Sequence, residues 1–512
     1  MLKHLTVLTW VLFAAGAALH VVRMLSGVVE PVEIDYGEGI ILFQASQILD
    51  LHQAFRPIEQ YPHIVFHYPP VYHLLLRLLT PLFSNPLLAG RLISMVSTLW
   101  IAGLFVWLVR RTSRRHAPAR TAWLAALFAC ACALHLPALE WVPYARVDLL
   151  GLALQFTALA LICAGLPSLP NHALAFLLLL LGLYTKQSLV AIPAAAILLV
   201  AAVRPMRALW LTLALIASGG GILLMLAWVT DGGVLKHWLL YNLNPFYVRS
   251  ALAWQLRLSA NLAPLVAAGL AASALTFPLA SGRDWRRSLG MARHRLAASP
   301  LRRAGLGFGV AFLFSFLTSW SIGKEGANLN YCLEWQFALC PLAGIFVMLL
   351  VRRWNQRDRA MLLMRPLVVV LFAVTTLQLG AEAAHDCGVA IGWPSGARRK
   401  LIAARREQAE LVRVISSFTG PVICENMTAL QLAGKTIPFE PAIIKQTAET
   451  GIFNETGLLN RTSSRFFDAV ILDKRSYSFR FTPRMLKAIR ENYRLQPFKG
   501  PNYLLYVRPG LE

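Results

Sequence analysis

The sequence is poor in acidic residues: 25 Asp and Glu stand against 49 Lys and Arg in 512 residues, and charged residues make up only 14%. Cysteine is also scarce, and no two of the seven Cys have the spacing of a zinc or redox motif. The Cys residues inside apolar stretches are expected to be buried small hydrophobic residues: Cys130, Cys132, Cys163 and Cys340. The cysteines therefore give no sign of a metal or redox centre.

Hydrophobic residues, in contrast, are abundant. They make up 57% of the chain, and the mean hydropathy is +0.56, far above the value of a soluble domain of this length. This composition predicts a polytopic α-helical membrane protein. The net charge of +24 would suggest a nucleic-acid partner in a soluble chain, but here the Arg residues lie in short loops between apolar stretches. We interpret them as signals of membrane orientation and expect no nucleic-acid binding.

The charges alternate along the chain. Basic residues concentrate in segments 110–116, 204–207, 283–303 and 352–359, which the positive-inside rule assigns to the cytoplasm. Segment 30–67 has the opposite composition, with Arg56 as its single Lys or Arg. Its acidic residues are Glu30, Glu33, Asp35, Glu38, Asp50 and Glu59. This segment is expected on the external face.

The number of spans follows from the lengths of the apolar stretches, since a helix needs about 20 apolar residues to cross a membrane. The expected spans are 5–25, 88–109, 121–139, 149–165, two short crossings within 173–203, 208–229, 259–280, 304–322, 333–351 and 361–379. This assignment gives about eleven transmembrane helices, with the first retained as an anchor, every Arg-rich loop inside and the C-terminus outside. Segment 69–83 is too short to span and is expected to be an external half-helix or re-entrant segment.

Two further regions are expected outside the membrane. Residues 39–55 have a helical, amphipathic pattern, which predicts a helix in the membrane interface with Asp35 and Glu38 at its N-terminal end. After about residue 379 the hydrophobic spans stop, and the chain divides into a transmembrane domain at 1–381 and an extracytoplasmic α/β domain at 382–512. The elements expected in that domain are helices at 403–418, 441–450 and 483–493 and strands at 421–425, 468–473 and 503–507. It has no Gly-rich phosphate loop or nucleophile triad, so recognition or capping is expected from it.

Five polar patches lie beside span ends: 35–38, 67–72, 140–148, 185–188 and 324–331. The topology above places all five on the external face. One such patch alone is explained by an ordinary polar loop, but five on one face favour a functional site. Acids and cations together suit glycosyl transfer from a polyprenyl-phosphate-linked sugar. Its leaving phosphate needs cationic stabilisation from Lys, Arg or a metal, and its acceptor hydroxyl needs a carboxylate base.

Several of these segments resemble a known family. An acidic residue in the first external loop, Tyr68-Pro69-Pro70-Val71-Tyr72 before Gly90-Arg91-Leu92, Arg146-Val147-Asp148 at a span start and Thr185-Lys186-Gln187 between short spans are similar to motifs of GT-C membrane glycosyltransferases. That superfamily includes the protein O-mannosyltransferases and the lipid A aminoarabinose transferase. The resemblance covers roughly residues 5–203. It implies a GT-C fold, a dolichyl- or undecaprenyl-phosphate-linked donor, an inverting mechanism and a catalytic Asp that corresponds to Asp35.

The candidate residues are assigned by chemistry. Asp35 is the expected base, and Glu38 and Asp148 are further candidate catalytic or metal-binding acids, so a divalent cation stays open as a cofactor. The expected substrate-binding residues are His67, Tyr68, Arg146, Lys186, Gln187, Lys324, Asn328, Asn330 and Tyr331. Among them Arg146, Lys186 and Lys324 would pair with the donor phosphate. Asn328, Asn330 and Tyr331 would form hydrogen bonds with sugar hydroxyls. For Lys186 the alternative is snorkelling from a short span, and for Tyr68 and Tyr72 it is an interfacial aromatic belt.

Two other functions compete with a glycosyltransferase. A polytopic transporter would place ionisable residues near the midplane and have internal repeats, and neither pattern is visible here. A noncatalytic, lipid-binding envelope assembly protein is favoured if the C-terminal domain is the working part. The expected partners are a polyprenyl-phosphate-sugar donor, membrane lipids and a lipid, glycan or protein acceptor. The Ala-, Leu- and Arg-rich composition is typical of a bacterium, which would place the chain in the inner membrane.

Overall fold

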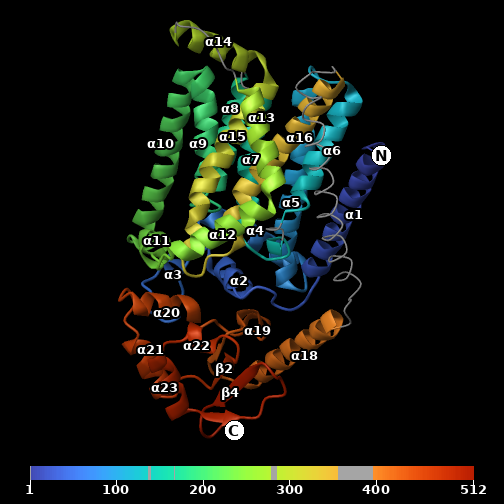
Figure 1. The fold of residues 1–512 in the computed structure, drawn as a ribbon. Helices are drawn as coiled ribbons and strands as arrows, with labels where there is room; N and C mark the ends of the chain where they lie inside the picture. The colour runs from blue at the N-terminus through green and yellow to red at the C-terminus, as the bar shows by residue number, and fades with distance from the viewer. Residues whose placement is uncertain (1, 137–139, 166–167, 278–284, 356–395, 512) are drawn as a thin grey trace.

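The structure, a computed structural model, describes residues 2–136, 140–165, 168–277, 285–355 and 396–511. Long apolar helices form a bundle, and an α/β unit made by the C-terminal part of the chain lies against one end of it (Figure 1). The short helix α2 (Glu38–Gln47) lies between the two parts. The site argued below lies at this junction.

Helices occupy the places of the spans expected within the described residues. They are α1 (Leu2–Val28), α5 (Pro86–Ser113), α6 (Ala119–Ala133), α7 (Asp148–Gly165), α8 (Leu169–Leu183), α9 (Ala191–Val203), α10 (Pro205–Val229), α13 (Ala263–Thr276), α15 (Pro300–Thr318) and α16 (Leu333–Asn355). Six helices are long and apolar enough to cross a membrane, and α6, α8 and α9 are shorter apolar helices. The expected span 361–379 lies outside the described residues, so the count of eleven stays a prediction.

The expected span at 259–280 needs a correction. The helix that ends there begins only at Ala263, and it follows α12 (Val248–Asn261) at a bend of 80°. Asn261 and Leu262 lie at the break, and Pro264 occupies the first turn of α13, where its missing N–H is tolerated. Only the two helices taken together have the length of a span, because α13 alone has 14 residues.

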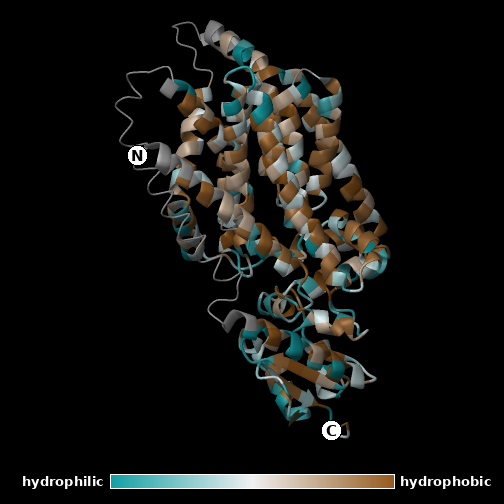
Figure 2. Cartoon of the chain, turned by 90° about the vertical axis from the view of Figure 1, so that its right-hand side faces the viewer, coloured by the Kyte–Doolittle hydropathy of each residue, from teal (hydrophilic) through white to brown (hydrophobic). Residues whose placement is uncertain are grey.

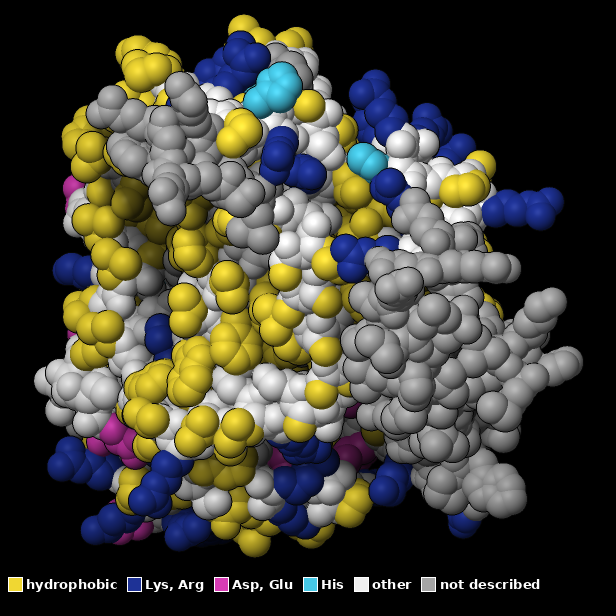
Figure 3. Space-filling model, turned by 45° about the horizontal axis from the view of Figure 1, so that its top comes forward, with side chains coloured by type: hydrophobic (Ala, Val, Ile, Leu, Met, Phe, Trp, Pro, Cys, Tyr) yellow, Lys and Arg dark blue, Asp and Glu magenta, His cyan; other side chains and the backbone are white. Residues whose placement is uncertain are grey.

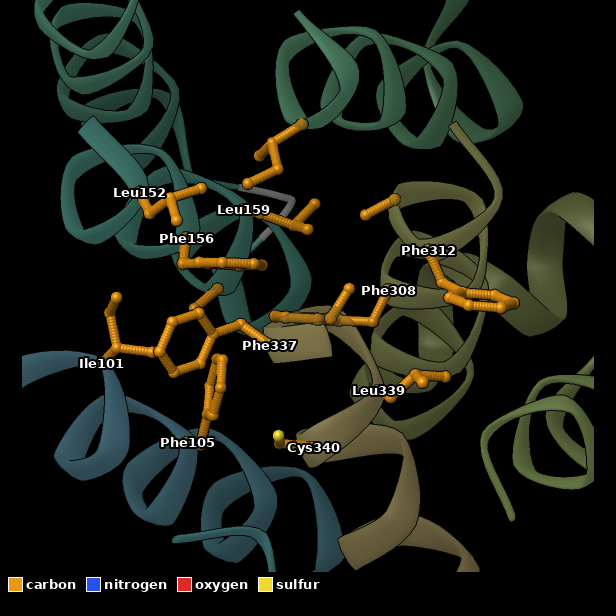
Figure 4. Packing of buried hydrophobic residues seen from close by; sticks show 14 of the residues in the cluster. Ile101, Phe105, Leu152, Phe156, Leu159, Phe308, Phe312, Phe337, Leu339 and Cys340 are labelled. Carbon is orange, nitrogen blue, oxygen red and sulfur yellow. The ribbon is translucent and has the colours of Figure 1, made fainter. Parts of the chain in front are cut away.

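The core of the bundle is apolar and aromatic. Phe105 of α5, Phe156 of α7, Phe308 of α15 and Phe337 of α16 are fully buried and pack against one another (Figure 4). The Phe156 and Phe308 rings are nearly parallel, at 3°, with their centroids 6.0 Å apart, and Phe105 meets both edge-on. These contacts join helices that are far apart in sequence and so help to hold the bundle together.

Basic loops gather at the end of the bundle away from the α/β unit. Partial burial lowers the pKa of the His116 imidazole, which follows α5, and the positive charges of Arg352, at the end of α16, and Arg302, at the start of α15, lower it further. Figure 3 shows Lys and Arg side chains over this end. Buried Arg303 is held there by the carbonyl oxygens of Cys163 and Leu296. The charge alternation of the sequence thus corresponds to two different ends of the molecule.

The opposite end holds the short helices. Helix α4 (Pro70–Leu79), followed by the 3-10 turn η1 (Thr80–Leu82), is a ten-residue helix, as the short segment 69–83 predicted. The prediction of an interfacial helix over 39–55 is wrong. Helix α2 ends at Gln47, α3 (Leu51–Ala54) follows, and every residue of α2 from Glu38 to Ala45 is buried. Helix α2 packs against α4 and against α19 of the α/β unit, which buries these residues, whereas the polar residues Ser46, Asp50 and Gln53 stay exposed.

The α/β unit contains a four-stranded sheet in the order β1-β2-β4-β3, with β1 (Val422–Cys424) parallel to β2 (Ala469–Asp473) and the other pairs antiparallel. The expected elements are present as these strands, β4 (Tyr503–Val507), α18 (Gly396–Ser417), α20 (Pro441–Glu449) and α23 (Pro483–Asn492). Four short elements were not foreseen: α19 (Met427–Leu432), α21 (Thr456–Ser463), α22 (Tyr477–Arg480) and β3 (Arg494–Gln496). The predicted domain boundary at 381/382 lies outside the described residues.

The sheet ties the unit to the bundle. Cys424 and Ile471 belong to one core that also includes α2 and α4, while Ile423 and Val470 face a second core on the other side of the sheet. Helix α2 approaches the backbone of α19 closely at Gly39, where an added Cβ would lie 2.3 Å from the backbone nitrogen of Thr428. The polar loops between the two apolar parts are visible in teal in Figure 2.

Candidate functional site

The five polar patches meet at the junction. Arg146 joins the patch at 140–148 to Asp35, and the Gln187 side chain donates to the carbonyl oxygen of His67 at 2.7 Å. Asp148 contacts both Lys186 and Asn330, which brings in the remaining patch. Residues separated by as many as 182 positions therefore form one polar network at the mouth of the bundle.

Asp35 and Arg146 form a partly exposed ion pair. Arg146 donates from Nε to Asp35 Oδ2 at 2.7 Å and also from Nη2, and the two side chains are 16% and 17% exposed. Gly37 makes room for this pair, because a Cβ there would lie 2.0 Å from the guanidinium nitrogen. Burial lowers the Arg146 pKa, but Asp35, Tyr68 and Asp148 together outweigh burial and hold the Arg146 pKa above its usual value. The expected base thus lies beside a cation at the mouth.

Glu38 is in a different environment. It is fully buried with Arg91 of α5, whose Nε and Nη2 donate to its two oxygens at 2.7 Å each. The same carboxylate accepts from the backbone nitrogens of Ile34, Asp35 and Ala145. This geometry occupies both oxygens and fixes the loop before α2 to α5. Within the described structure Glu38 is therefore a clamp, and the expectation that it is a catalytic or metal-binding acid is not favoured by its contacts.

Asp148, the first residue of α7, is also fully engaged. Its carboxylate pairs with Lys186 and accepts from Asn330 Nδ2 at 2.9 Å and Trp141 Nε1 at 3.0 Å. Lys186 lies 4.6 Å from the centre of the Tyr331 ring, a cation–π distance. The snorkelling alternative for Lys186 is wrong, because its side chain is 4% exposed and paired inside the protein.

His67 and Tyr68 lie beside this cluster. Burial, with smaller contributions from His237 and Arg146, lowers the pKa of His67 to about 3, so its imidazole is neutral. Burial raises the pKa of Tyr68 to about 12, and its closest charged groups are Lys186 and Arg146. Tyr72 is fully buried and its hydroxyl donates to the Gly90 carbonyl at 3.3 Å, so the aromatic-belt alternative is wrong for Tyr72.

Three polar atoms in this region are buried without a hydrogen-bond partner among the described residues: His67 Nε2, Gln187 Oε1 and Asn330 Oδ1. Buried polar groups in proteins are nearly always bonded, to protein, water or ligand. These atoms come from three loops and lie in the polar network. They are the places where a polar ligand or bound water would be received.

Two expected residues lie apart from the network. Asn328 is exposed, and its side chain accepts from the backbone nitrogen of Leu329 as the cap of the 3-10 helix η5 (Leu329–Cys332). Lys324 pairs through its backbone with Phe246 near the start of α12. Among the described residues, no ion pair joins the Lys324 ammonium group to the acids of the network. The sugar-binding role expected of Asn328 is therefore not favoured by its position.

Residues of the α/β unit reach the same place, which the sequence did not predict. The Tyr36 hydroxyl accepts from the backbone nitrogen of Ala442, and the Arg480 guanidinium lies 3.6 Å from the centre of the Tyr36 ring. Glu440, which precedes α20, is 9% exposed, lies two residues before the Ala442 that bonds Tyr36, and is within electrostatic range of Arg146 and Asp35. Burial raises the pKa of Glu440 to about 7, the two Arg lowering it and Asp35 raising it. No spacing in the sequence connects residue 440 with residue 35.

The role of Arg91 inside the bundle had a weak signal in the sequence, which is its position in an apolar stretch. An Arg in such a stretch requires buried partners, and these are Glu38 and the carbonyl oxygens of Gly27 and Val32. In the described part of the chain no group of three or more His, Cys, Asp or Glu side chains is arranged to hold a metal ion.

The fold has known counterparts. No family model and no curated protein sequence matches this chain. Among solved structures, ArnT from Cupriavidus metallidurans bound to undecaprenyl phosphate aligns with a TM-score of 0.58 and 15% identity over 98% of each chain. The apo state of the same protein aligns with a TM-score of 0.54 and 13% identity over 97% of each chain. ArnT is the lipid A aminoarabinose transferase, a GT-C glycosyltransferase. The chain described here therefore has the ArnT-like fold that the sequence resemblance to GT-C enzymes predicted.

Proposed function

We propose that this protein is an integral membrane glycosyltransferase of GT-C type that moves a sugar from a polyprenyl-phosphate-linked donor to an acceptor on the external face. The observation that carries the proposal is the position of Arg146. It lies between an acidic half of the site, with Asp35, and a half with Lys186, Tyr68 and Tyr331. The ArnT-like fold supports the same reading, since one ArnT structure is bound to undecaprenyl phosphate.

The donor phosphate would be held by Arg146 and Lys186. The bonds from Arg146 to Asp35 use Nε and Nη2, which leaves the Nη1 side of the guanidinium for a phosphate oxygen. Lys186 adds a second positive charge on the far side of Tyr68. The unpartnered atoms of Gln187 and Asn330 would then bond hydroxyls of the sugar.

The transfer is a single displacement. The acceptor hydroxyl gives its proton to the Asp35 carboxylate while its oxygen forms a bond to the anomeric carbon of the sugar. The bond from that carbon to the phosphate oxygen breaks, and polyprenyl phosphate leaves with the electron pair, so the configuration inverts. Cations at the phosphate stabilise the charge that develops on the leaving group, and no general acid is needed.

The experiment that tests the proposal uses the full-length protein and a strain that lacks it. Mass spectrometry of lipid-linked sugars and envelope glycans should show one product missing in the deletion strain and the donor accumulating. Purified wild-type protein added to vesicles of total membrane lipid from that strain should restore the product. Asp35→Asn should lower the initial rate about 100- to 10,000-fold, the usual contribution of a positioned base, while undecaprenyl phosphate still binds.

Glu59→Gln is the matched control, because Glu59 is an exposed acid in the same external segment. It should leave the rate unchanged. Undecaprenyl phosphate binding with no turnover in any vesicle would instead support the noncatalytic lipid-binding alternative. Normal transfer by Asp35→Asn would show that the base is another residue.

A further inference from the structure

Glu440 is a buried carboxylate whose contacts explain no structural role. It is the residue before α20, a position where an acidic side chain usually accepts from the helix backbone, yet its side chain makes no such capping bond. None of the hydrogen bonds described for the chain uses its carboxylate. Its oxygens are not among the fully buried atoms that lack a partner, so the carboxylate stays accessible at the junction and is free to accept a hydrogen bond from a ligand.

The helix that begins there lies across the mouth of the bundle. At its start, Tyr36 bonds the backbone of Ala442. One turn further on, Gln446 Nε2 is 3.6 Å from where a Cβ on Gly326 would be, and at its end Glu449 lies near Tyr247. Helix α20 therefore extends from the Asp35 loop to the loop before α16, on the side of Arg146 that faces the α/β unit.

The two carboxylates that flank Arg146 thus come from opposite sides of the junction. Asp35 belongs to the bundle, and Glu440 belongs to the α/β unit. Lys186, Tyr68 and Tyr331, which would hold the donor, all come from bundle loops. A second substrate would meet the site from the side that the α/β unit covers.

We propose that Glu440 is an acceptor-binding residue, supplied by the C-terminal unit, that accepts a hydrogen bond from a hydroxyl of the acceptor beside Asp35. This inference rests on the proposed function and deepens it. It gives the C-terminal unit a part in the active site that agrees with the recognition role expected from the sequence. The ionised form makes the stronger bond, since charge-assisted hydrogen bonds are about twice as strong as neutral ones.

A pH dependence follows from the groups that face Glu440. They are Asp35 and Tyr36 from the first loop, Arg146 from the loop before α7, and Arg480 from α22, which is itself paired with Glu425. Burial is the largest influence and raises the pKa of Glu440 to about 7. Transfer that needs ionised Glu440 should therefore increase as the pH rises through about 7 and level off above it.

The test compares full-length Glu440→Gln and Glu440→Asp with wild type in the same vesicles of deletion-strain lipid. Glu440→Gln should lower the initial rate roughly 10- to 100-fold at pH 8 and lose the rise near pH 7. Diluting these vesicles with acceptor-free lipid should lower the rate of Glu440→Gln more steeply than the rate of wild type, because the variant binds the acceptor more weakly. Glu440→Asp keeps the charge and should recover part of the rate.

Two readings keep this inference separate from the proposed function. Undecaprenyl phosphate, used alone as the binding probe, should bind Glu440→Gln with wild-type affinity. Glu449→Gln, on the exposed end of the same helix, should transfer normally. Wild-type rate and pH profile in Glu440→Gln, or an equal loss of phosphate binding and transfer, would overturn the inference. Absence of turnover by the wild-type protein itself would instead refute the proposed function, and the inference with it.

Discussion

At the scale of single residues, the acidic turn after α1 contains two carboxylates with different surroundings. Asp35 is partly exposed and forms an ion pair with Arg146. Glu38, three residues later, is fully buried, where it pairs with Arg91 and accepts hydrogen bonds from backbone nitrogens. Because helix α2 begins at Glu38, that side chain turns into the bundle, while Asp35 stays in the loop at the mouth. Three positions along the chain thus separate a candidate reactive group from a structural one.

The contrast predicts opposite phenotypes. Removing one partner of a buried ion pair leaves the other charge uncompensated and typically costs about 3–5 kcal/mol. Glu38→Gln should therefore lower the thermal unfolding temperature of the detergent-solubilised protein strongly, whereas Asp35→Asn should melt close to wild type. A Glu38→Gln protein of normal stability with abolished transfer would mean that Glu38 takes part in the chemistry.

At the scale of elements, the position of Glu440 depends on how α2 meets α19. Gly39 allows the first turn of α2 to touch the backbone of Met427 and Thr428, and the Glu33 carboxylate accepts from the Thr428 nitrogen at 2.9 Å. On the far side, Arg405 of α18 pairs with Glu30. The junction is therefore a backbone contact flanked by two polar links, and small residues at the contact decide its width.

Gly39→Ala tests this contact. Its Cβ would lie 2.3 Å from backbone, which cannot move aside as a side chain can, and such overpacking costs about 1–3 kcal/mol. Amide hydrogen exchange should accelerate several-fold in α19 and remain unchanged in β2. Transfer should fall too, because Glu440 moves away from Arg146. Gly457→Ala is the control, since a Cβ there meets nothing within 4 Å; equal effects of both variants would contradict the argument.

At the scale of the whole molecule, the two ends of the bundle differ in charge and in contents. Basic loops gather at one end, and the polar network and the α/β unit lie at the other. The positive-inside rule predicts that the basic end faces the cytoplasm. The predicted count of eleven crossings, which includes the span expected at 361–379, would place α18 on the external face.

Reporter fusions test this orientation. A reporter that is active only in the external compartment should give signal when joined after Ser417 and none when joined at Arg115 or Arg295. No signal is expected at Arg115 and Arg295 because the translocation of Arg-rich loops across the membrane is unfavourable. An external signal from the Arg295 fusion would show that the bent pair α12 and α13 does not cross as one span.

The sequence alone determined the class, the places of most long helices in the described residues and most members of the network. Membrane insertion is decided locally, because each span needs enough consecutive apolar residues and each loop's charge can be counted. Strands β1, β2 and β4 and three helices of the C-terminal unit were likewise predictable from short apolar runs and helical periodicity. The convergence of residues 35, 146, 148 and 186 followed from placing their loops on one face.

Only the tertiary structure decided which side chains of that face touch. Glu38 became a clamp because Arg91 needs a buried partner, and Asn328 became a cap because its loop turns outward. Amphipathicity placed α2 at the membrane surface, but residues Glu38 to Ala45 pack against α4 and against the α/β unit, a contact between segments some 390 residues apart. The same contact brings Glu440 to Arg146. Such proximity depends on packing between distant segments, which no local pattern in the chain encodes.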